Sequence, residues 1–218
     1  MKKHIFLALA ALIFPTSLFA ATMTLNTVDD GWVRTFGGDT VNTGDTTISV
    51  SQSGANIFNG IFEFNLAGID DNATINSVAF EWTNTRFISN LGANAEVDLF
   101  AYLGDGSVTI SDFNAAGDQV ADTSVSTGGS PGDVNTIAFT DLTMFTSALL
   151  GDLLSVRFET DSFASFQIAS LENQDWAAGR LIVDYTPGQV SAVPLPASGL
   201  LLLGALGGVA GLRRRNKT

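Results

Sequence analysis

The chain has 218 residues and a formal net charge of −12 at pH 7, a length typical of one or two domains. All 22 acidic residues lie between Asp29 and Asp184, with only four arginines and no lysine among them. The resulting net charge of −18 excludes nucleic-acid binding. The chain has no cysteine, and His4 is its one histidine. The lack of cysteine excludes disulfides and Cys-His catalysis. Because the one histidine is at position 4, Ser-His-Asp catalysis and histidine zinc sites are excluded from the rest of the chain.

The N-terminal segment 1–20 has the pattern of a secretory signal. Lys2 and Lys3 precede an apolar run at 5–14, and small residues follow up to Ala20. We expect signal peptidase to cut after Ala20, although the large Leu18 allows the cut to move by one position. The alternatives are a buried helix and a membrane anchor, but the run is too short to span the ~30 Å of bilayer hydrocarbon.

Residues 21–186 show short apolar–polar alternations separated by turn residues, the pattern of strands. The predicted strands lie at 32–35, 46–51, 62–66, 75–83, 96–101, 135–139, 154–159, 163–169 and 181–185. Roughly ten strands in one acidic domain predict an all-β fold, an antiparallel β-sandwich of the jelly-roll kind.

One stretch has a helical period instead. Leu142, Phe145 and Leu149 recur at helical spacing after Asp141, which is suited to cap the start, and Gly151 is a stop signal. We expect one short helix that crosses an end of the sandwich.

The densest acidic loop runs from Asp105 through Asp112 to Asp118. Calcium takes six to eight oxygen ligands, and these three carboxylates are candidates for some of them, with a bend at Gly106. The loop lacks the EF-hand spacing. The alternative interpretation is that these aspartates favour turns and keep the surface soluble. No other cofactor is indicated.

Trp176 is the candidate sugar-binding residue. Sugar rings stack on exposed aromatic side chains, and the polar residues 172–175 before it suit hydroxyl groups. The alternative is a tryptophan packed inside a loop or the core. Paired carboxylates can hydrolyse glycosides, but among 22 acidic residues a suitable pair arises by chance, so no catalytic residue is assigned.

The C-terminal part has a linker at 187–192 and a three-part tail at 193–218. The tail opens with the proline motif Val193-Pro194-Leu195-Pro196-Ala197, continues with an apolar helix to Leu212 and closes with the basic cluster Arg213, Arg214 and Arg215. The helix is marginal for a full membrane span, and its basic end should stay in the cytoplasm. The alternative is a plain membrane anchor.

This tail resembles the PEP-CTERM sorting signals of bacteria, in the variant built on V-P-L-P-A. The resemblance implies that an exosortase cuts near the proline motif after a transient stay in the inner membrane. Leu195 replaces the glutamate of the name-giving motif, which leaves the exosortase subtype open.

The body more weakly resembles the DNRLRE-type domains, in the stretches 30–34, 45–50, 62–66, 73–78, 169–172 and 180–185. That resemblance implies a carbohydrate-binding-like jelly roll of secreted and surface proteins. The Phe-Glu-Phe at 62–64 departs from the basic-plus-Phe pattern usual in the second strand.

The sequence therefore predicts an exported protein of the cell surface or extracellular matrix, with a structural or adhesive role and no catalysis. Its partners would be the export machinery, signal peptidase and an exosortase. The alternative is a carbohydrate-binding module for exopolysaccharide, and a glycoside-active enzyme is the third hypothesis.

Overall fold

The computed structural model describes residues 19–161 and 163–188, so the tail and nearly all of the expected signal lie outside the described residues. This part of the chain contains eleven strands, one short α-helix and two 3-10 helices. The strands are β1 (Ala21–Arg34), β2 (Thr40–Asn42), β3 (Thr47–Ser53), β4 (Asn56–Asn65), β5 (Thr74–Thr83), β6 (Asn94–Leu103), β7 (Asp118–Ser126), β8 (Val134–Ala138), β9 (Leu153–Glu159), β10 (Ser165–Ala169) and β11 (Arg180–Thr186). The helices are η1 (Ile110–Asn114), α1 (Thr143–Ala148) and η2 (Leu149–Gly151).

The prediction of a mostly antiparallel β fold with one short helix is confirmed. Each predicted strand overlaps an observed one, whereas β2, β7 and residues 21–31 of β1 were not predicted. The predicted helix covers α1 and η2. Asp141 accepts a hydrogen bond from the Thr143 N–H at 2.8 Å, although Leu142 occupies the cap position itself.

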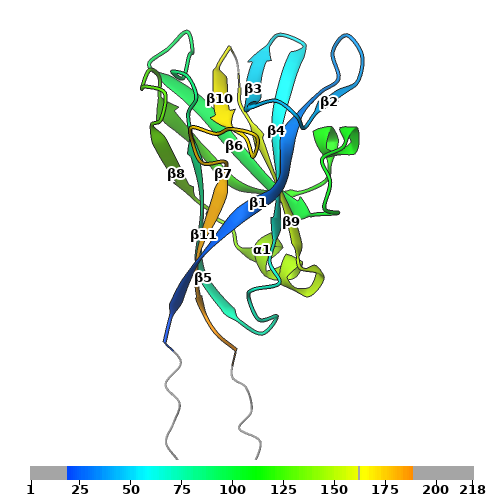
Figure 1. Ribbon diagram of the computed structural model, residues 1–218, viewed down its shortest axis with the longest axis vertical. Helices are drawn as coiled ribbons and strands as arrows, with labels where there is room; N and C mark the ends of the chain where they lie inside the picture. Colours follow the sequence, from blue (N-terminus) through cyan, green and yellow to red (C-terminus); the bar gives the residue numbers. More distant parts are fainter. Residues whose placement is uncertain (1–18, 162, 189–218) are drawn as a thin grey trace, which may run out of the picture. The chain divides into compact units, whose positions relative to one another are not determined.

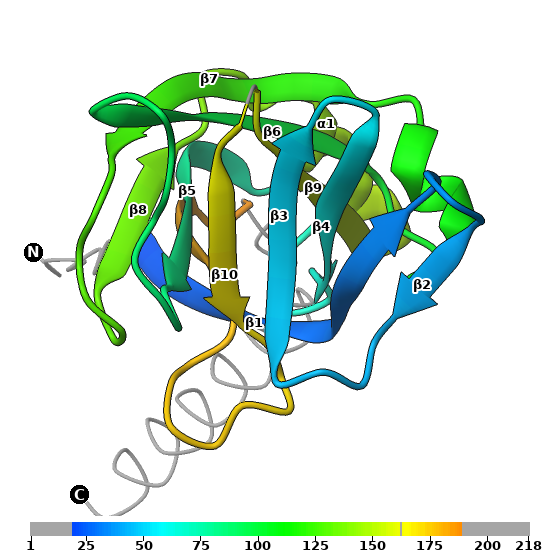
Figure 2. The same cartoon turned by 90° about the horizontal axis from the view of Figure 1, so that it is seen from above.

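The strands form one continuous curled sheet. Its order is β7-β6-β9-β4-β1-β11-β5-β8, and every neighbouring pair is antiparallel. Strand β3 pairs with β4 and β10, and β2 pairs with β1. The sheet curls back on itself, so its strands surround a common interior in the manner of a sandwich or partly closed barrel (Figures 1 and 2).

Strand β1 belongs to both halves of this sheet. Its residues 21–26 pair with β11, and its residues 27–34 pair with β4. The register shifts between Thr27 and Asp29. Such an irregularity bends a strand, which lets one strand turn the corner between two layers.

An aromatic cluster fills the interior. Phe62, Phe80, Trp82 and Phe158 are fully buried, with ring centroids 4.9 Å apart for Phe62 and Phe80 and 5.2 Å apart for Trp82 and Phe158. The Trp82 indole N–H donates to the Asn84 side chain at 3.0 Å, so its polar atom is satisfied inside the core. Large rings supply much buried apolar area, which suits a chain that has no cysteine to form disulfides.

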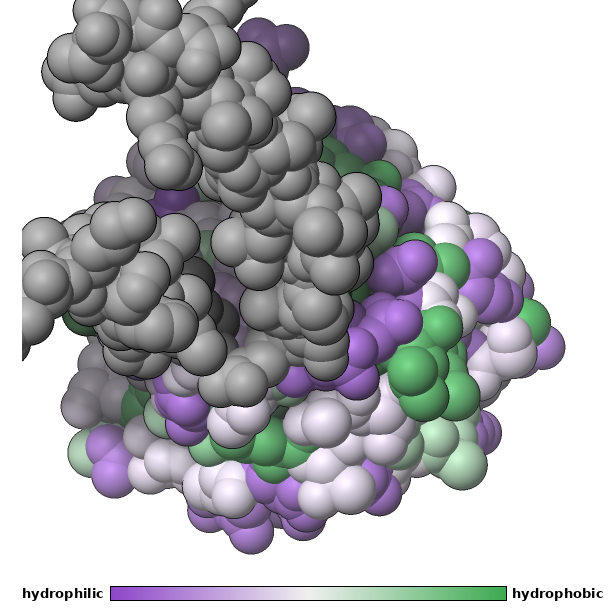
Figure 3. All heavy atoms as spheres, turned by 90° about the horizontal axis from the view of Figure 1, so that it is seen from below, coloured by the Kyte–Doolittle hydropathy of each residue, from purple (hydrophilic) through white to green (hydrophobic). Residues whose placement is uncertain are grey.

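The two ends of the domain lie side by side. Ala21 in β1 pairs with Tyr185 in β11, and both strands leave at the same end (Figure 1). The compact unit that contains the sheet ends at Gly188. None of the helices at 19–161 and 163–188 is long and apolar enough to cross a membrane. Seen from below, the described surface carries small, separate apolar groups among polar residues (Figure 3).

Candidate functional site

The loop between β10 and β11 is held by its own side chains. The side-chain oxygen Oδ1 of Asn173 accepts hydrogen bonds from the backbone N–H groups of Asp175 and Trp176, both at 2.9 Å. The side-chain Nδ2 of Asn173 donates to the Thr46 backbone carbonyl at 2.9 Å. The Ser170 hydroxyl donates to the Asp45 carbonyl at 2.6 Å. Asparagine and serine commonly fix turns in this way, so the loop presents Trp176 from a rigid frame.

Trp176 lines a pocket of about 310 Å³, which we call the Trp176 pocket. Its lining is Asn26, Thr27, Ser170, Leu171, Asn173, Trp176, Ala177, Ala178 and Gly179. The indole is half-buried, and a Cβ placed on Gly132 would lie 2.9 Å from its Nε1 atom, so Gly132 leaves the room that the ring occupies. Asn26 is exposed where it lines this pocket.

This pocket combines an aromatic face with amide and hydroxyl groups in a volume at the lower end of small-molecule sites. Such a lining can stack against the apolar face of a sugar ring and bind its hydroxyl groups. The sequence-predicted Trp176 thus lies at the rim of a cavity and not in the main core. The other pocket residues were not predicted, because β1 and the loop meet only in the fold.

Asp30 is a buried residue that holds Leu171, one of the residues lining the Trp176 pocket. It is 1 % exposed, and its Oδ2 accepts the Leu171 N–H at 3.0 Å, while its Oδ1 has no partner among the described residues. Burial raises the pKa of Asp30 from 3.8 to about 7, and the nearby charges of Glu172 and Asp29 act in the same direction. This carboxyl group therefore anchors Leu171 and titrates near neutral pH.

The three aspartates proposed for calcium do not converge. Asp105 accepts hydrogen bonds from the Ser107 N–H and hydroxyl, both at 3.0 Å, in a turn where Gly106 has a φ of 85°. Asp112 is buried, and Asp118 lies in β7 opposite Ala101. No group of three or more acidic or histidine side chains able to hold a metal occurs in residues 19–161 and 163–188. The described geometry gives the calcium hypothesis no support.

Asp112 instead holds a local structure together. Its Oδ2 accepts the Thr109 N–H at 2.6 Å at the start of η1, and its Oδ1 accepts the Tyr102 hydroxyl at 3.1 Å. This is the reciprocal capping arrangement of a helix start. Burial and the Asp112 charge raise the pKa of Tyr102 far above its usual value, so the phenol stays a donor.

A third buried carboxylate, Glu63, lies on the outer side of the sheet under the segment 104–117. It accepts hydrogen bonds from the Ser155 hydroxyl and from the Gly106 N–H, the latter at 3.3 Å. Burial raises its pKa. The alternation of β4 correctly places Glu63 away from the core, but it does not reveal the loop that covers it. The covering loop also buries Val108 against Val33 and Ile61.

Arg157 completes this outer layer. It is 7 % exposed, forms an ion pair with Glu159, and donates to the carbonyls of Asp112 at 3.1 Å and Ala115 at 2.8 Å. Its guanidinium lies 5.0 Å from the centre of the Phe100 ring. Glu63 and Arg157 thus hold the covering loop through hydrogen bonds to its backbone, which is a structural role.

The sequence matches no model of a known protein family. A search of curated proteins likewise found no similar protein.

Proposed function

We propose that this chain is an exported bacterial protein of the cell surface or extracellular matrix, sorted by an exosortase that cuts at the proline motif 193–197. The proposal rests on the two terminal sequence signals, and one structural observation supports it. Ala21 and Tyr185 lie opposite each other, so the expected signal-peptidase junction and the linker start from the same end of the domain. A domain of this kind can be held at one end while the rest of its surface stays free.

The role that we propose for the domain is structural or adhesive, without catalysis. The two most deeply buried carboxylates, Asp30 and Glu63, are enclosed by protein atoms, and each holds a backbone N–H of a neighbouring loop. The mature domain contains neither histidine nor cysteine. These features favour binding over turnover as the activity of the domain.

The intact mass of the protein from cells with and without the exosortase tests the sorting proposal. We expect a mass that ends between Val193 and Ala197 only when the exosortase is present. The double variant Pro194→Ala/Pro196→Ala should stay uncut, whereas Pro187→Ala in the linker should be cut normally. An uncut tail in both strains would overturn the proposal and leave a plain membrane anchor.

Carbohydrate binding is the second candidate function, and the Trp176 pocket favours it. The pocket offers one aromatic ring with amide and hydroxyl groups around it, and the sandwich-like fold supports the expected likeness to jelly-roll carbohydrate-binding domains. Binding to exopolysaccharide of the producing cells should fall at least tenfold in Trp176→Ala. Phe87→Ala, which removes another exposed ring, should bind normally. Equal binding by both variants would exclude the Trp176 pocket as the sugar site.

A further inference from the structure

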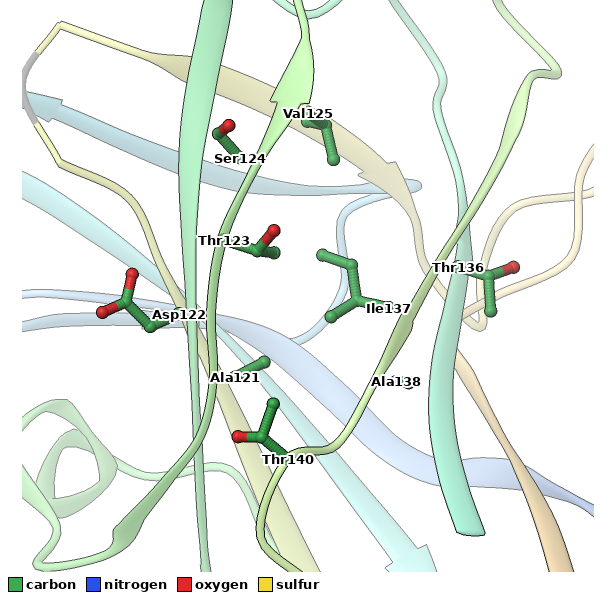
Figure 4. Close-up of a pocket in the computed structure, with 9 residues that line it drawn as sticks. All are labelled: Ala121, Asp122, Thr123, Ser124, Val125, Thr136, Ile137, Ala138 and Thr140. Atoms are coloured by element: carbon green, nitrogen blue, oxygen red, sulfur yellow. The ribbon is translucent and has the colours of Figure 1, made fainter.

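The two ends of the curled sheet face each other without joining. Strands β7 and β8 are the first and last in the strand order, and among residues 19–161 and 163–188 each pairs with a neighbour on one side only. Within the described residues, one backbone hydrogen bond connects them, from the Thr140 N–H just after β8 to the Val120 carbonyl at 2.7 Å. Above it lies an open groove of about 340 Å³ between the two strands, which we call the slot (Figure 4).

Backbone groups and small side chains line the slot. Its residues are Ala121, Asp122, Thr123, Ser124 and Val125 of β7 with Thr136, Ile137, Ala138 and Thr140 on the β8 side. Ile137 points from β8 across the gap toward β7, and Thr123 points toward it (Figure 4). Because β7 and β8 each have an unpaired edge, a strand between them can bond with both. Small side chains on β7 leave room for apolar side chains that point inward.

The outer face beside the slot carries a row of carboxylates. Glu159 in β9 pairs with Asp98 in β6, and Asp98 pairs with Asp122 in β7. Like charges directly opposite each other on neighbouring strands repel. Arg157 neutralises Glu159, and Gln119 donates to Asp98 at 2.8 Å, but Asp122 has no ion pair or side-chain hydrogen bond in the described residues. Asp122 points away from the gap, on the outer side of β7 (Figure 4).

We propose that the slot binds an extended segment of another protein, whose residues alternate between apolar side chains pointing inward and lysine or arginine pointing outward. Such a segment adds a strand between β7 and β8, and its basic side chains continue the row Glu159, Asp98, Asp122. A second copy of this chain does not fit, because its residues 21–186 contain no lysine and only four arginines against 22 acidic residues. This inference does not depend on sorting or on sugar binding.

The test uses the purified full chain and three synthetic nine-residue peptides with blocked ends. One alternates valine and lysine, one alternates valine and glutamate, and one has the composition of the first with all valines before all lysines. Binding is followed by titration calorimetry and by hydrogen exchange of the amides at 120–126 and 134–138. We expect saturable one-to-one binding of the alternating valine–lysine peptide alone, with slower exchange in both strands.

Three variants separate strand insertion from general attraction to an acidic surface. Asp122→Lys should weaken the valine–lysine peptide at least tenfold. Asp71→Lys makes the same charge change at an exposed turn between β4 and β5, and should alter binding less than twofold. Thr123→Phe fills the slot without a charge change and should also weaken binding. Circular dichroism checks that each variant is folded.

Three outcomes would overturn the proposal. The first is an absence of binding up to the solubility of the valine–lysine peptide. The second is equal binding of the peptide that has all its valines before its lysines, or equal weakening by Asp122→Lys and Asp71→Lys. Either result would indicate charge attraction alone. The third is binding that leaves amide exchange in β7 and β8 unchanged.

Discussion

Ala21 and Tyr185 lie directly opposite each other on the antiparallel strands β1 and β11, although they stand at the two ends of the domain's sequence. The pairing continues through Thr22 with Asp184 and Met23 with Val183. The first strand of the domain is thus completed by the last, so this part of the sheet can form only when nearly the whole domain is present.

A cross-strand disulfide tests this relationship. The variant Ala21→Cys/Tyr185→Cys should oxidise readily, because opposite residues in an antiparallel pair have Cα atoms about 4.5–5.5 Å apart. Closing a loop of this size should raise the free energy of unfolding by about 5 kcal/mol, measured by urea denaturation with and without reductant. The control Ser53→Cys/Tyr185→Cys should stay reduced, since Ser53 lies in β3, which β4 connects to the end of β1 opposite Ala21. Equal oxidation of both pairs would contradict the register.

Gly179 leaves space for two core rings. A Cβ atom at this position would lie 2.8 Å from Cδ1 of Phe62 and 3.1 Å from Cε2 of Phe80. Gly179→Ala should therefore lower the free energy of unfolding by about 1–3 kcal/mol, through overpacking. Gly151→Ala serves as the control, because no atom of the described residues lies within 4 Å of its added Cβ. An unchanged free energy of unfolding in Gly179→Ala would mean that the two rings move aside at no cost.

Arg157 should contribute much more to stability than its exposed counterpart. Arg157→Ala leaves Glu159 without its ion-pair partner and two loop carbonyls without their donor, so we expect a loss of about 3 kcal/mol in the free energy of unfolding. Arg180→Ala breaks the more exposed pair with Glu81 and should lose less than about 1 kcal/mol. Faster hydrogen exchange in 104–117 should accompany only the Arg157 change. The reverse order of losses would refute this role.

The stability of the domain should fall as the pH rises through the range from about 4 to 7. The folded Asp30 has a pKa of about 7, whereas the unfolded residue titrates near 3.8, so in this range only the folded state holds the proton. Below this range Asp30 is protonated in both the folded and the unfolded state, so it does not make the stability depend on pH. Above it the penalty for a buried charge is complete. Glu63, whose pKa burial also raises, acts in the same direction.

Urea denaturation at pH 5 and pH 8 measures this dependence. The decrease in unfolding free energy between the two should be smaller by about 2 kcal/mol in Asp30→Asn than in the parent protein. Asp175→Asn, a change at an exposed position of the loop after β10, should keep the parent slope. An unchanged slope in Asp30→Asn would show that Asp30 ionises without cost in the folded state.

The alternation of apolar and polar residues predicts most of the sheet, because nearly all strands have one face on the core. Strand β7 was not predicted, and the reason is physical. Its residues Asp122, Thr123 and Ser124 are all exposed, since this strand borders the slot, and a strand open on both faces carries no apolar period. The missed strand and the candidate binding groove are therefore the same feature.

The candidate sites were predicted unevenly. Trp176 stood out because polar residues surround it, and it does line a pocket. Asp112 was named as one candidate calcium ligand, although its spacing from Thr109 is that of a helix cap. The burial of Glu63 and Asp30 depends on loops from distant parts of the chain, and a local pattern carries no information on such contacts.

The position of β11 between β1 and β5 determines how the domain would respond to a mechanical load. Suppose that the C-terminal end is pulled while the opposite end of the domain is held. The force then runs along β11 and shears its hydrogen-bond ladders with β1 and β5. Those ladders comprise six residue pairs with β1 and seven with β5. In shear, the hydrogen bonds share the force and must yield together, whereas a terminal strand such as β8 would peel away one bond at a time. The domain should therefore resist a pull on its C-terminal end better than a pull on β8.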